Sequence, residues 1–176
     1  MAFKRSKLGL DSPVNNFATF NSVDFANGAS IPNIRTGNLR SGHSGGDYRF
    51  ALSTIGNLKT GKWYWEYYNN EAGSNTSFSQ IGVITKQYNA GSPGRRMYQG
   101  YGGNTYGASG SGETYGASFA LSAGQVLGCF LDLDNGTIEF FYNGASQGIA
   151  HTDLIQDFTA GEYQGGWFPA LGSVNY

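Results

Sequence analysis

The sequence is poor in charged residues, in cysteine and in long apolar runs. Charged residues make up 13% of the chain, and the 11 basic and 12 acidic residues nearly balance. An average soluble domain has about twice that charged share. A nearly neutral chain offers no general attraction for nucleic acid or for an anionic membrane, so we expect neither as a partner. The single cysteine, Cys129, excludes an internal disulfide.

No stretch reaches the run of about 18 apolar residues that a membrane-spanning helix needs. Residues 1–8, MAFKRSKL, do not have the apolar segment of a secretory signal. We therefore expect a soluble protein with no membrane insertion and no visible export route.

Glycine and aromatic residues are what the chain has in quantity. It contains 28 glycines and 15% aromatic residues in 176 residues, a composition that favours strands and turns over helices. This length suits one all-β domain, which we place at residues 15–176. Residues 1–14 have no sustained periodicity, and we expect them to form a basic arm in which Lys4, Arg5 and Lys7 anchor the chain to an acidic protein surface. A solvated terminus without a partner is the alternative.

Residues 126–144 predict two strands joined by a tight turn. Asn135 and Gly136 can both adopt the positive φ angles of a two-residue type I′ turn. Such a turn would create one apolar face from three cross-strand pairs: Leu133 with Ile138, Leu131 with Phe140, and Cys129 with Tyr142. A second Asn-Gly pair at residues 143–144 predicts another reversal toward residues 148–150.

Other short apolar clusters predict strands at residues 17–20, 49–52, 61–68 and 78–84. Within residues 61–68, alternation places Trp63, Trp65 and Tyr67 on one face, and Tyr64, Glu66 and Tyr68 on the other. The spacing of strands and turns is typical of an antiparallel β-sandwich.

Residues 88–118 are crowded with glycine and tyrosine, and they are too many for a plain connection. They must contain short strands or form binding loops. Tyrosines on glycine-rich loops offer large amphipathic contact areas at low entropic cost. We therefore expect partner contacts in this region, at Tyr88, Arg95, Arg96, Tyr98, Tyr101, Tyr106 and Tyr115. The alternative is that these tyrosines cover a sheet edge.

Metal and cofactor sites have little support. The acidic turn at residues 132–136 resembles the start of a calcium loop, but Thr137 and Asn143 stand where an EF-hand needs Gly and Glu. The predicted register sets Asp132 opposite Glu139, and we expect a nearby Lys or Arg to compensate this repulsion; the alternative is a cation that bridges the two carboxylates outside any EF-hand pattern. The two histidines, His43 and His151, stand alone in the sequence. Neither belongs to an HxxxH or CxxC pattern, so a zinc site has little support. We expect no metal and no cofactor.

Catalytic patterns are also missing. No GxSxG nucleophile turn and no GxxxxGK[ST] phosphate loop occurs, and Cys129 lies on the apolar face of its strand. We therefore expect no enzyme activity. The acidic residues of a sugar hydrolase follow no local pattern, so a carbohydrate-binding or carbohydrate-active protein stays a distant alternative.

A series of short motifs in fixed order resembles the SPRY domain. Its members are GKWYWE at 61–66, IGV at 81–83, YGASF at 115–119, GQVLGCFLD at 124–132, NGTIEFFYNG at 135–144, GIA at 148–150 and WFPAL at 167–171. The resemblance implies a bent sandwich of two antiparallel sheets with a protein-binding surface at one end, generally without catalysis. The family's closing strand is absent or reduced to residues 174–176. An edge left open in this way allows pairing with a neighbouring chain, including a homo-oligomer.

The lead-in at residues 34–40 and 53–56 resembles the version of this domain in phage structural proteins. The leading prediction is therefore a virion surface component, a capsid decoration or a head- or tail-fibre subunit, bound to virion proteins or to a host receptor. The alternative prediction is a cytoplasmic adaptor that recognises a peptide or protein partner.

Overall fold

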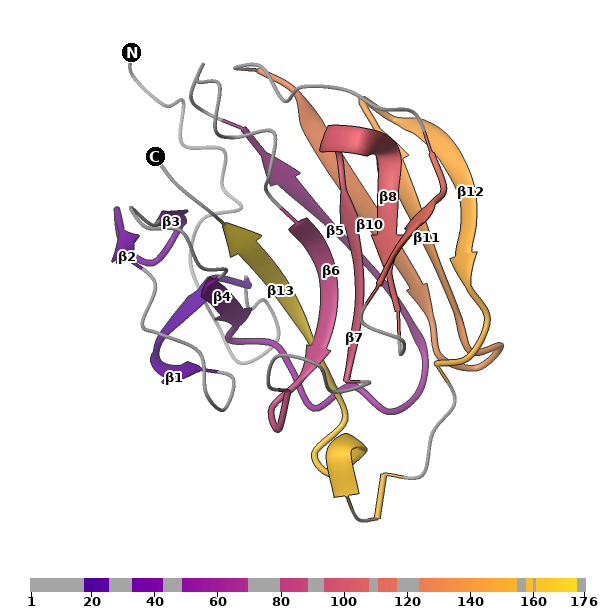
Figure 1. The fold of residues 1–176 in the computed structure, drawn as a ribbon. Helices are drawn as coiled ribbons and strands as arrows, with labels where there is room; N and C mark the ends of the chain where they lie inside the picture. The colour runs from indigo at the N-terminus through magenta and orange to yellow at the C-terminus, as the bar shows by residue number, and fades with distance from the viewer. Residues whose placement is uncertain are drawn as a thin grey trace.

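The computed structural model describes residues 18–25, 33–42, 49–69, 80–88, 94–107, 111–116, 124–154, 158–159 and 161–173. Within these residues the chain forms two antiparallel sheets and one small hairpin (Figure 1). The described helical segments are two short 3-10 turns, η2 (Tyr101–Gly103) and η3 (Gly161–Tyr163). No helix within these ranges has the length and apolar character that crossing a bilayer requires.

The larger sheet has seven strands in the order β1-β4-β13-β6-β7-β8-β9. Its strands are β1 (Phe20–Phe25), β4 (Arg49–Ser53), β13 (Trp167–Ser173), β6 (Gln80–Thr85), β7 (Arg95–Gln99), β8 (Asn104–Tyr106) and β9 (Gly112–Thr114). The smaller sheet has the order β12-β11-β10-β5, formed by β12 (Ala145–His151), β11 (Thr137–Tyr142), β10 (Val126–Asp132) and β5 (Lys62–Tyr68). The separate hairpin pairs β2 (Asn33–Arg35) with β3 (Arg40–Gly42). These elements confirm the predicted all-β antiparallel architecture.

The main core lies between the two sheets. Alternate residues of β10 and β11 supply it, among them Leu127, Cys129, Leu131 and Phe140, all at 1% exposure or less. They pack against side chains of the larger sheet such as Val83. This confirms the predicted apolar face of the hairpin and the buried position of Cys129, whose thiol has its pKa raised by that burial.

The register predicted for this hairpin is wrong by two residues. Leu131 pairs with Ile138, and Cys129 pairs with Phe140. The loop is longer than expected because the Asp132 carboxylate accepts the backbone N–H groups of Asp134 and Asn135, each at 3.1 Å. Of Asn135 and Gly136, only Gly136 has a positive φ, at 70°. A shift of two residues keeps every side chain on the same face of its strand. The predicted apolar face of the hairpin is therefore correct although the register is not.

The corrected register also removes the predicted repulsion between Asp132 and Glu139. Glu139 lies opposite Phe130, and Asp132 lies opposite Thr137. The expected basic partner is nevertheless present, since Lys62 Nζ lies 3.0 Å from Asp132 Oδ2. The hydrogen bond from Asn135 and the ion pair with Lys62 hold the pKa of Asp132 below its ordinary value.

The second Asn-Gly pair forms the turn that was predicted for it. Asn143 and Gly144 have φ angles of 48° and 79°, and they connect Tyr142 to its partner Ala145 at the start of β12. Two positive φ angles in succession match the type I′ turn of a tight hairpin.

Two predicted features lie outside the described residues. They are the basic arm at residues 1–14, with Lys4, Arg5 and Lys7, and the reduced closing strand at residues 174–176. The last described strand, β13, lies inside the larger sheet between β4 and β6 (Figure 1).

Candidate functional site

Three of the residues predicted to contact a partner are buried in the fold. Tyr98 and Arg96 have 0% exposure, and Tyr88 has 5%. The Tyr98 ring stacks on Phe140 with 5.4 Å between centroids, and it meets Tyr115 edge-to-face at 5.3 Å. Burial raises the pKa of Tyr98 well above its ordinary value. We therefore do not carry Tyr88, Arg96 and Tyr98 forward as partner contacts, because their side chains are buried in contacts within the fold.

Arg96 of β7 forms an ion pair with Asp153, which lies just after β12. Its Nε and Nη2 donate to Asp153 Oδ1 and Oδ2 at 2.8 and 2.7 Å. The guanidinium also lies 5.6 Å from the ring centre of Trp167. Next to this pair, His151 Nε2 lies 2.6 Å from the Thr105 hydroxyl. Burial and the nearby Arg96 charge lower the pKa of His151 to about 4.

The other predicted contacts are Arg95, Tyr106, Tyr115 and Tyr101. Arg95 is partly exposed and lies between two rings, 4.8 Å from the centre of Tyr106 and 5.7 Å from that of Tyr88. Tyr115 is half-buried and donates its hydroxyl to the Gly148 carbonyl oxygen. Burial raises the pKa of Tyr115 to about 12. The Tyr101 side chain lies outside what the structure describes. Arg95, Tyr106 and Tyr115 thus remain predicted contacts.

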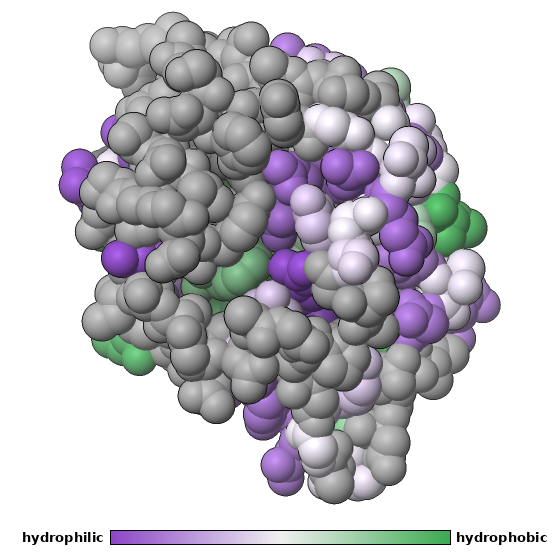
Figure 2. Space-filling model, viewed as in Figure 1, coloured by the Kyte–Doolittle hydropathy of each residue, from purple (hydrophilic) through white to green (hydrophobic). Residues whose placement is uncertain are grey.

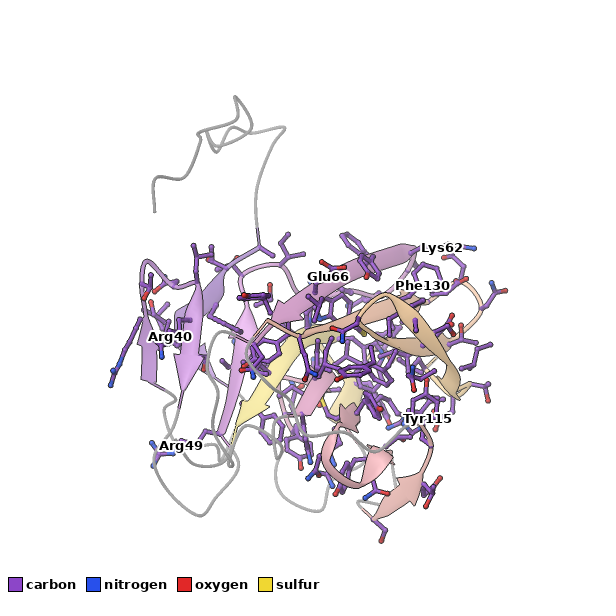
Figure 3. The ribbon with its side chains drawn as sticks, turned by 90° about the horizontal axis from the view of Figure 1, so that it is seen from above. Arg40, Arg49, Lys62, Glu66, Tyr115 and Phe130 are labelled. Carbon is purple, nitrogen blue, oxygen red and sulfur yellow. The ribbon has the colours of Figure 1, made fainter. Side chains whose placement is uncertain are left out.

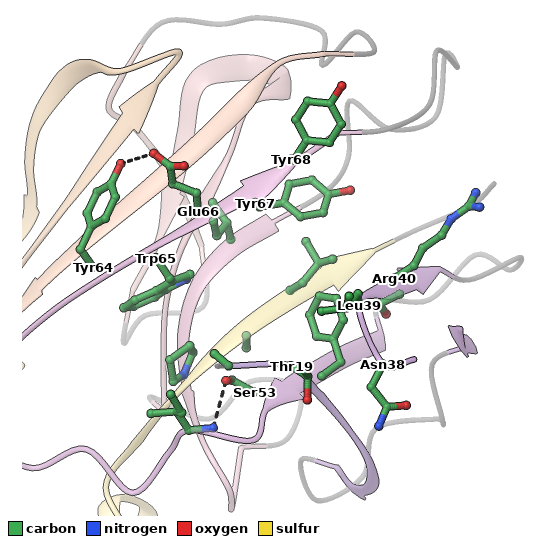
Figure 4. Close-up of a pocket in the computed structure, with 18 of the residues that line it drawn as sticks. Thr19, Asn38, Leu39, Arg40, Ser53, Tyr64, Trp65, Glu66, Tyr67 and Tyr68 are labelled. Carbon is green, nitrogen blue, oxygen red and sulfur yellow. Dashed lines mark hydrogen bonds between the residues drawn. The ribbon is translucent and has the colours of Figure 1, made fainter. Parts of the chain in front are cut away.

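A cavity that the sequence did not reveal opens beside β5, at the edge of the smaller sheet (Figure 4). Its volume is about 690 Å³, in the range typical of ligand sites. One wall is β5 together with Asn69. Residues 18–20 and the turn between β2 and β3 form the other wall, and residues 169–171 of β13 lie between them with Ile55, Leu58 and Ile81. We call this cavity and its two walls the β5 groove.

The β5 strand supplies most of the aromatic surface of the groove. Trp65 and Tyr67 face inward and pack against the core, as the predicted alternation requires. Tyr64 and Tyr68 lie on the opposite face with 53% and 58% exposure, and Trp63 is 38% exposed. Figure 4 shows Tyr64, Glu66 and Tyr68 on one side of the strand and Trp65 on the other. Rings so exposed are the side chains that most often anchor protein partners.

The opposite wall is held in place by an unusual turn. Thr36, Gly37 and Asn38 have φ angles of 56°, 62° and 64°, which only glycine adopts without cost. The backbone N–H of Phe20 donates to the Asn38 carbonyl oxygen at 2.7 Å, so β1 supports this turn. The turn presents Leu39, which is 67% exposed, at the rim of the groove.

A polar pair sits on the outer face of β5. The Tyr64 hydroxyl donates to Glu66 Oε1 at 2.7 Å, and burial together with this carboxylate raises the pKa of Tyr64 to about 12. The Tyr64 ring can lie across the sheet because residue 128 is glycine, whose added Cβ would come within 2.6 Å of the hydroxyl. Because its pKa is raised, Tyr64 stays a neutral hydrogen-bonding group next to a carboxylate at physiological pH.

The groove offers ring faces, hydroxyl groups and apolar area, which suit the binding of a macromolecular segment. In the part of the chain that the structure describes, no group of three or more His, Cys, Asp or Glu side chains could hold a metal ion. In Figure 3, Arg40 at one end of the groove lies on the opposite side of the view from Tyr115, and Glu66 lies between them. The described surface in the view of Figure 2 is mainly polar or neutral in hydropathy.

Sequence reasoning missed the groove because strand order is a long-range property. The alternation of residues 61–68 was visible, and it identified the two faces of β5. Nothing in those residues indicates that β5 lies at a sheet edge, or that the β2–β3 turn stands opposite to it.

Comparisons with known proteins agree with this fold. The family model of the SPRY domain matches residues 62–170. Human Ran-binding protein 9 is 44% identical over 57 residues, which are 32% of this chain and 8% of that protein. The Ran-binding proteins 9/10 homolog of Drosophila melanogaster is 42% identical over 57 residues, 32% of this chain and 6% of that protein. The chain thus matches only a small part of either relative.

A solved structure supports the fold over a longer range. The SPRY domain of human HERC1 superimposes with a TM-score of 0.65 at 20% sequence identity. The match covers 88% of this chain and 89% of that one.

Proposed function

This chain belongs to the SPRY domain family, and from that premise we propose that it is a non-enzymatic adaptor module that binds a protein partner in the β5 groove. SPRY domains are protein-interaction modules, and the family model covers residues 62–170. The observation that carries the proposal is the groove, in which exposed aromatic side chains flank a cavity of about 690 Å³.

The physical argument concerns the apolar side-chain surface that the groove exposes to water. Tyr64, Tyr68, Trp63 and Leu39 all present apolar surface to water at one location. Apolar area removed from water contributes about 25 cal/mol per Å², and aromatic residues concentrate binding energy at interface centres. Large apolar patches with polar rims mark interaction sites on otherwise polar surfaces. A protein partner that covers these side chains would therefore gain affinity here.

The relatives support a general property and not a specific partner. Their names describe them as Ran-binding, but the shared segment is a third of this chain. We therefore extend to this chain only the binding of protein. The adaptor function accords with these eukaryotic relatives. The virion component predicted from residues 34–40 and 53–56 finds no support among them, so it stays a prediction, as do the virion and cytoplasmic locations.

A quantitative capture experiment tests the proposal. The immobilised full chain and the double variant Tyr64→Ala/Tyr68→Ala would be exposed to extract from the source cells, and retained proteins would be quantified by mass spectrometry. The matched control, Val23→Ala/Ile149→Ala, removes two other exposed apolar side chains that are not among the residues lining the groove.

We expect at least one protein to be retained by the wild type and the control, and to be lost from the groove variant. It must then bind the purified wild type directly, with an affinity that falls about 10-fold or more when the two rings are removed. Equal retention by all three proteins would contradict the proposal.

A further inference from the structure

The outer edge of β5 has a defined set of backbone groups that point away from its neighbour. Among the described strands β5 pairs only with β10. The N–H of Asn69 donates to Gln125 O, and the N–H of Leu133 donates to Gly61 O, each at 2.9 Å. In an antiparallel pair every second residue bonds its partner, so the odd-numbered positions 61 to 69 face β10.

The opposite side of β10 confirms this assignment. The N–H of Asn143 donates to Val126 O at 2.8 Å, so the even-numbered residues of β10 bond β11 and its odd-numbered residues bond β5. The backbone N–H and C=O groups of Lys62, Tyr64, Glu66 and Tyr68 are therefore directed outward from the sheet, over the groove. An open strand edge of this kind is a template for pairing with another chain.

The shape of the groove restricts what can pair there. Strands in a sheet are about 4.8 Å apart, and packed sheets are about 10 Å apart. A strand added to β5 would lie above the larger sheet, with residues 18–20 and the β2–β3 turn as its second wall. An extended segment suits such a two-walled cavity better than a second folded copy, whose own β5 would have to enter between the same walls.

The two faces of β5 also define the side chains of the occupant. Paired residues on adjacent strands share a face, so residues opposite Tyr64 and Glu66 would point outward, and those opposite Trp65 would point into the apolar cavity. Glu66 is exposed, and its contact among the described residues is the neutral Tyr64 hydroxyl. Lys62, the nearest base on β5, is paired with Asp132. A positively charged side chain on the occupant, opposite Glu66, could form an ion pair with the Glu66 carboxylate on the outer face.

We propose that the β5 edge binds an extended segment of a partner protein by β-strand addition, with apolar residues alternating into the cavity and a Lys or Arg on the outer face beside Glu66. This inference rests on the proposed protein-binding function and adds its mode. Backbone bonds to Tyr64, Glu66 and Tyr68 supply affinity, and the alternating side chains supply selectivity.

Amide hydrogen exchange of the full chain, read residue by residue by NMR, tests this mode. The probe is a short synthetic peptide in which Leu alternates with Thr and the central Thr is replaced by Lys. In the chain alone, the amides of Tyr64, Glu66 and Tyr68 should exchange fast, and those of Trp63, Trp65 and Tyr67 should be protected by β10. The peptide should slow the even-numbered amides at least 10-fold.

Two N-methylated forms of the peptide provide the matched control. Methyl groups on the Lys and Thr amides would block the hydrogen bonds to β5 and should weaken binding about 2- to 10-fold for each bond lost. In an antiparallel pairing the Leu amides point away from β5, so methyl groups on them should have much less effect; a parallel strand would reverse the order of the two effects. Equal loss for both forms would show that no strand is added and would overturn the inference, while the binding function itself would stand.

Charge exchange tests the stated chemistry of the occupant. Replacing the central Lys of the peptide by Glu should weaken binding about 2- to 5-fold, and the variant Glu66→Lys should reverse that preference. The same result for both peptides would overturn the requirement for a basic residue.

The remaining outcomes also decide the question. Absence of binding by the Lys peptide would contradict the inference. Protection of Tyr64 and Glu66 in the chain alone would assign the edge to another occupant, and would equally contradict it. Protection independent of protein concentration would indicate a segment of the same chain, and protection that grows with concentration would indicate a second copy.

Discussion

The tyrosine region of β7 and β8 and the β5 groove are both rich in aromatic residues, but they use them in opposite ways. Tyr98 is fully buried and stacks on Phe140 in the core. Tyr64 and Tyr68, at 53% and 58% exposure, lie on the outer face of an edge strand. Composition alone assigns the same role to both regions. The difference comes from position, because Tyr98 points into the core between the two sheets, whereas Tyr64 and Tyr68 lie on the outer face of β5.

The charged groups of the two regions differ in the same sense. Arg96 has 0% exposure and is paired with Asp153 at 2.7 Å, so its charge is used within the fold. Glu66 is exposed and contacts the Tyr64 hydroxyl, so its charge remains available to a partner. One region therefore contributes stability, and the other has surface to contribute to binding.

The largest expected contrast is between two tyrosine truncations. Tyr98→Ala would leave a cavity beside Phe140 and should lower the free energy of unfolding by about 4 kcal/mol, as large core truncations do. Tyr68→Ala removes an exposed ring and should change it by less than about 0.5 kcal/mol. Urea unfolding followed by tryptophan fluorescence measures both. Similar losses for the two variants would remove the distinction between the regions.

The ion pair of Arg96 with Asp153 should show the next largest effect. Asp153→Ala leaves the buried Arg96 guanidinium without its carboxylate and should cost about 3 kcal/mol of unfolding free energy. Arg96→Met replaces the charge by an apolar side chain of comparable length and should cost less. Calorimetric unfolding of both variants checks the order. If Arg96→Met proves the more damaging of the two, the cost of an unpaired buried charge is not what holds this region.

A pH dependence of stability should follow from His151. Its pKa is about 4 in the folded protein and 6.5 in its ordinary state, so the unfolded chain takes up a proton first as the pH falls. The neutral imidazole beside Thr105 and Arg96 therefore contributes stability that is present above pH 6.5 and is lost between 6.5 and about 4. Unfolding free energies across that range should decline, and the decline should be smaller in His151→Gln. An unchanged slope in the variant would assign the dependence to other groups.

Much of the fold was predictable because it depends on local alternation. The period-2 pattern of residues 126–142 identified the core face that Leu131, Cys129 and Phe140 form. The hairpin register was not predictable from Asn135-Gly136 alone, since the Asp132 carboxylate competes for the turn amides. Such side-chain competition changes the loop length without changing the hydrophobic pattern.

The candidate site was much harder to predict. Tyr98 and Tyr106 look alike in a Tyr/Gly-rich sequence, and only the strand pairing decides that one is buried. The groove forms where β5, the β2–β3 turn and β13 meet. The β2–β3 turn and β13 lie more than 100 residues apart in the sequence. No motif of the sequence records that meeting.

The most direct test of the central claim compares partner binding by the two regions. Once a partner has been captured by the full chain, its affinity would be measured by isothermal titration calorimetry for Tyr64→Ala/Tyr68→Ala and for Arg95→Ala/Tyr106→Ala. The second variant removes two partly exposed members of the tyrosine region. We predict a loss of about 10-fold or more for the groove variant and little change for the other. A loss confined to Arg95→Ala/Tyr106→Ala would contradict the account and place the binding site in the tyrosine region.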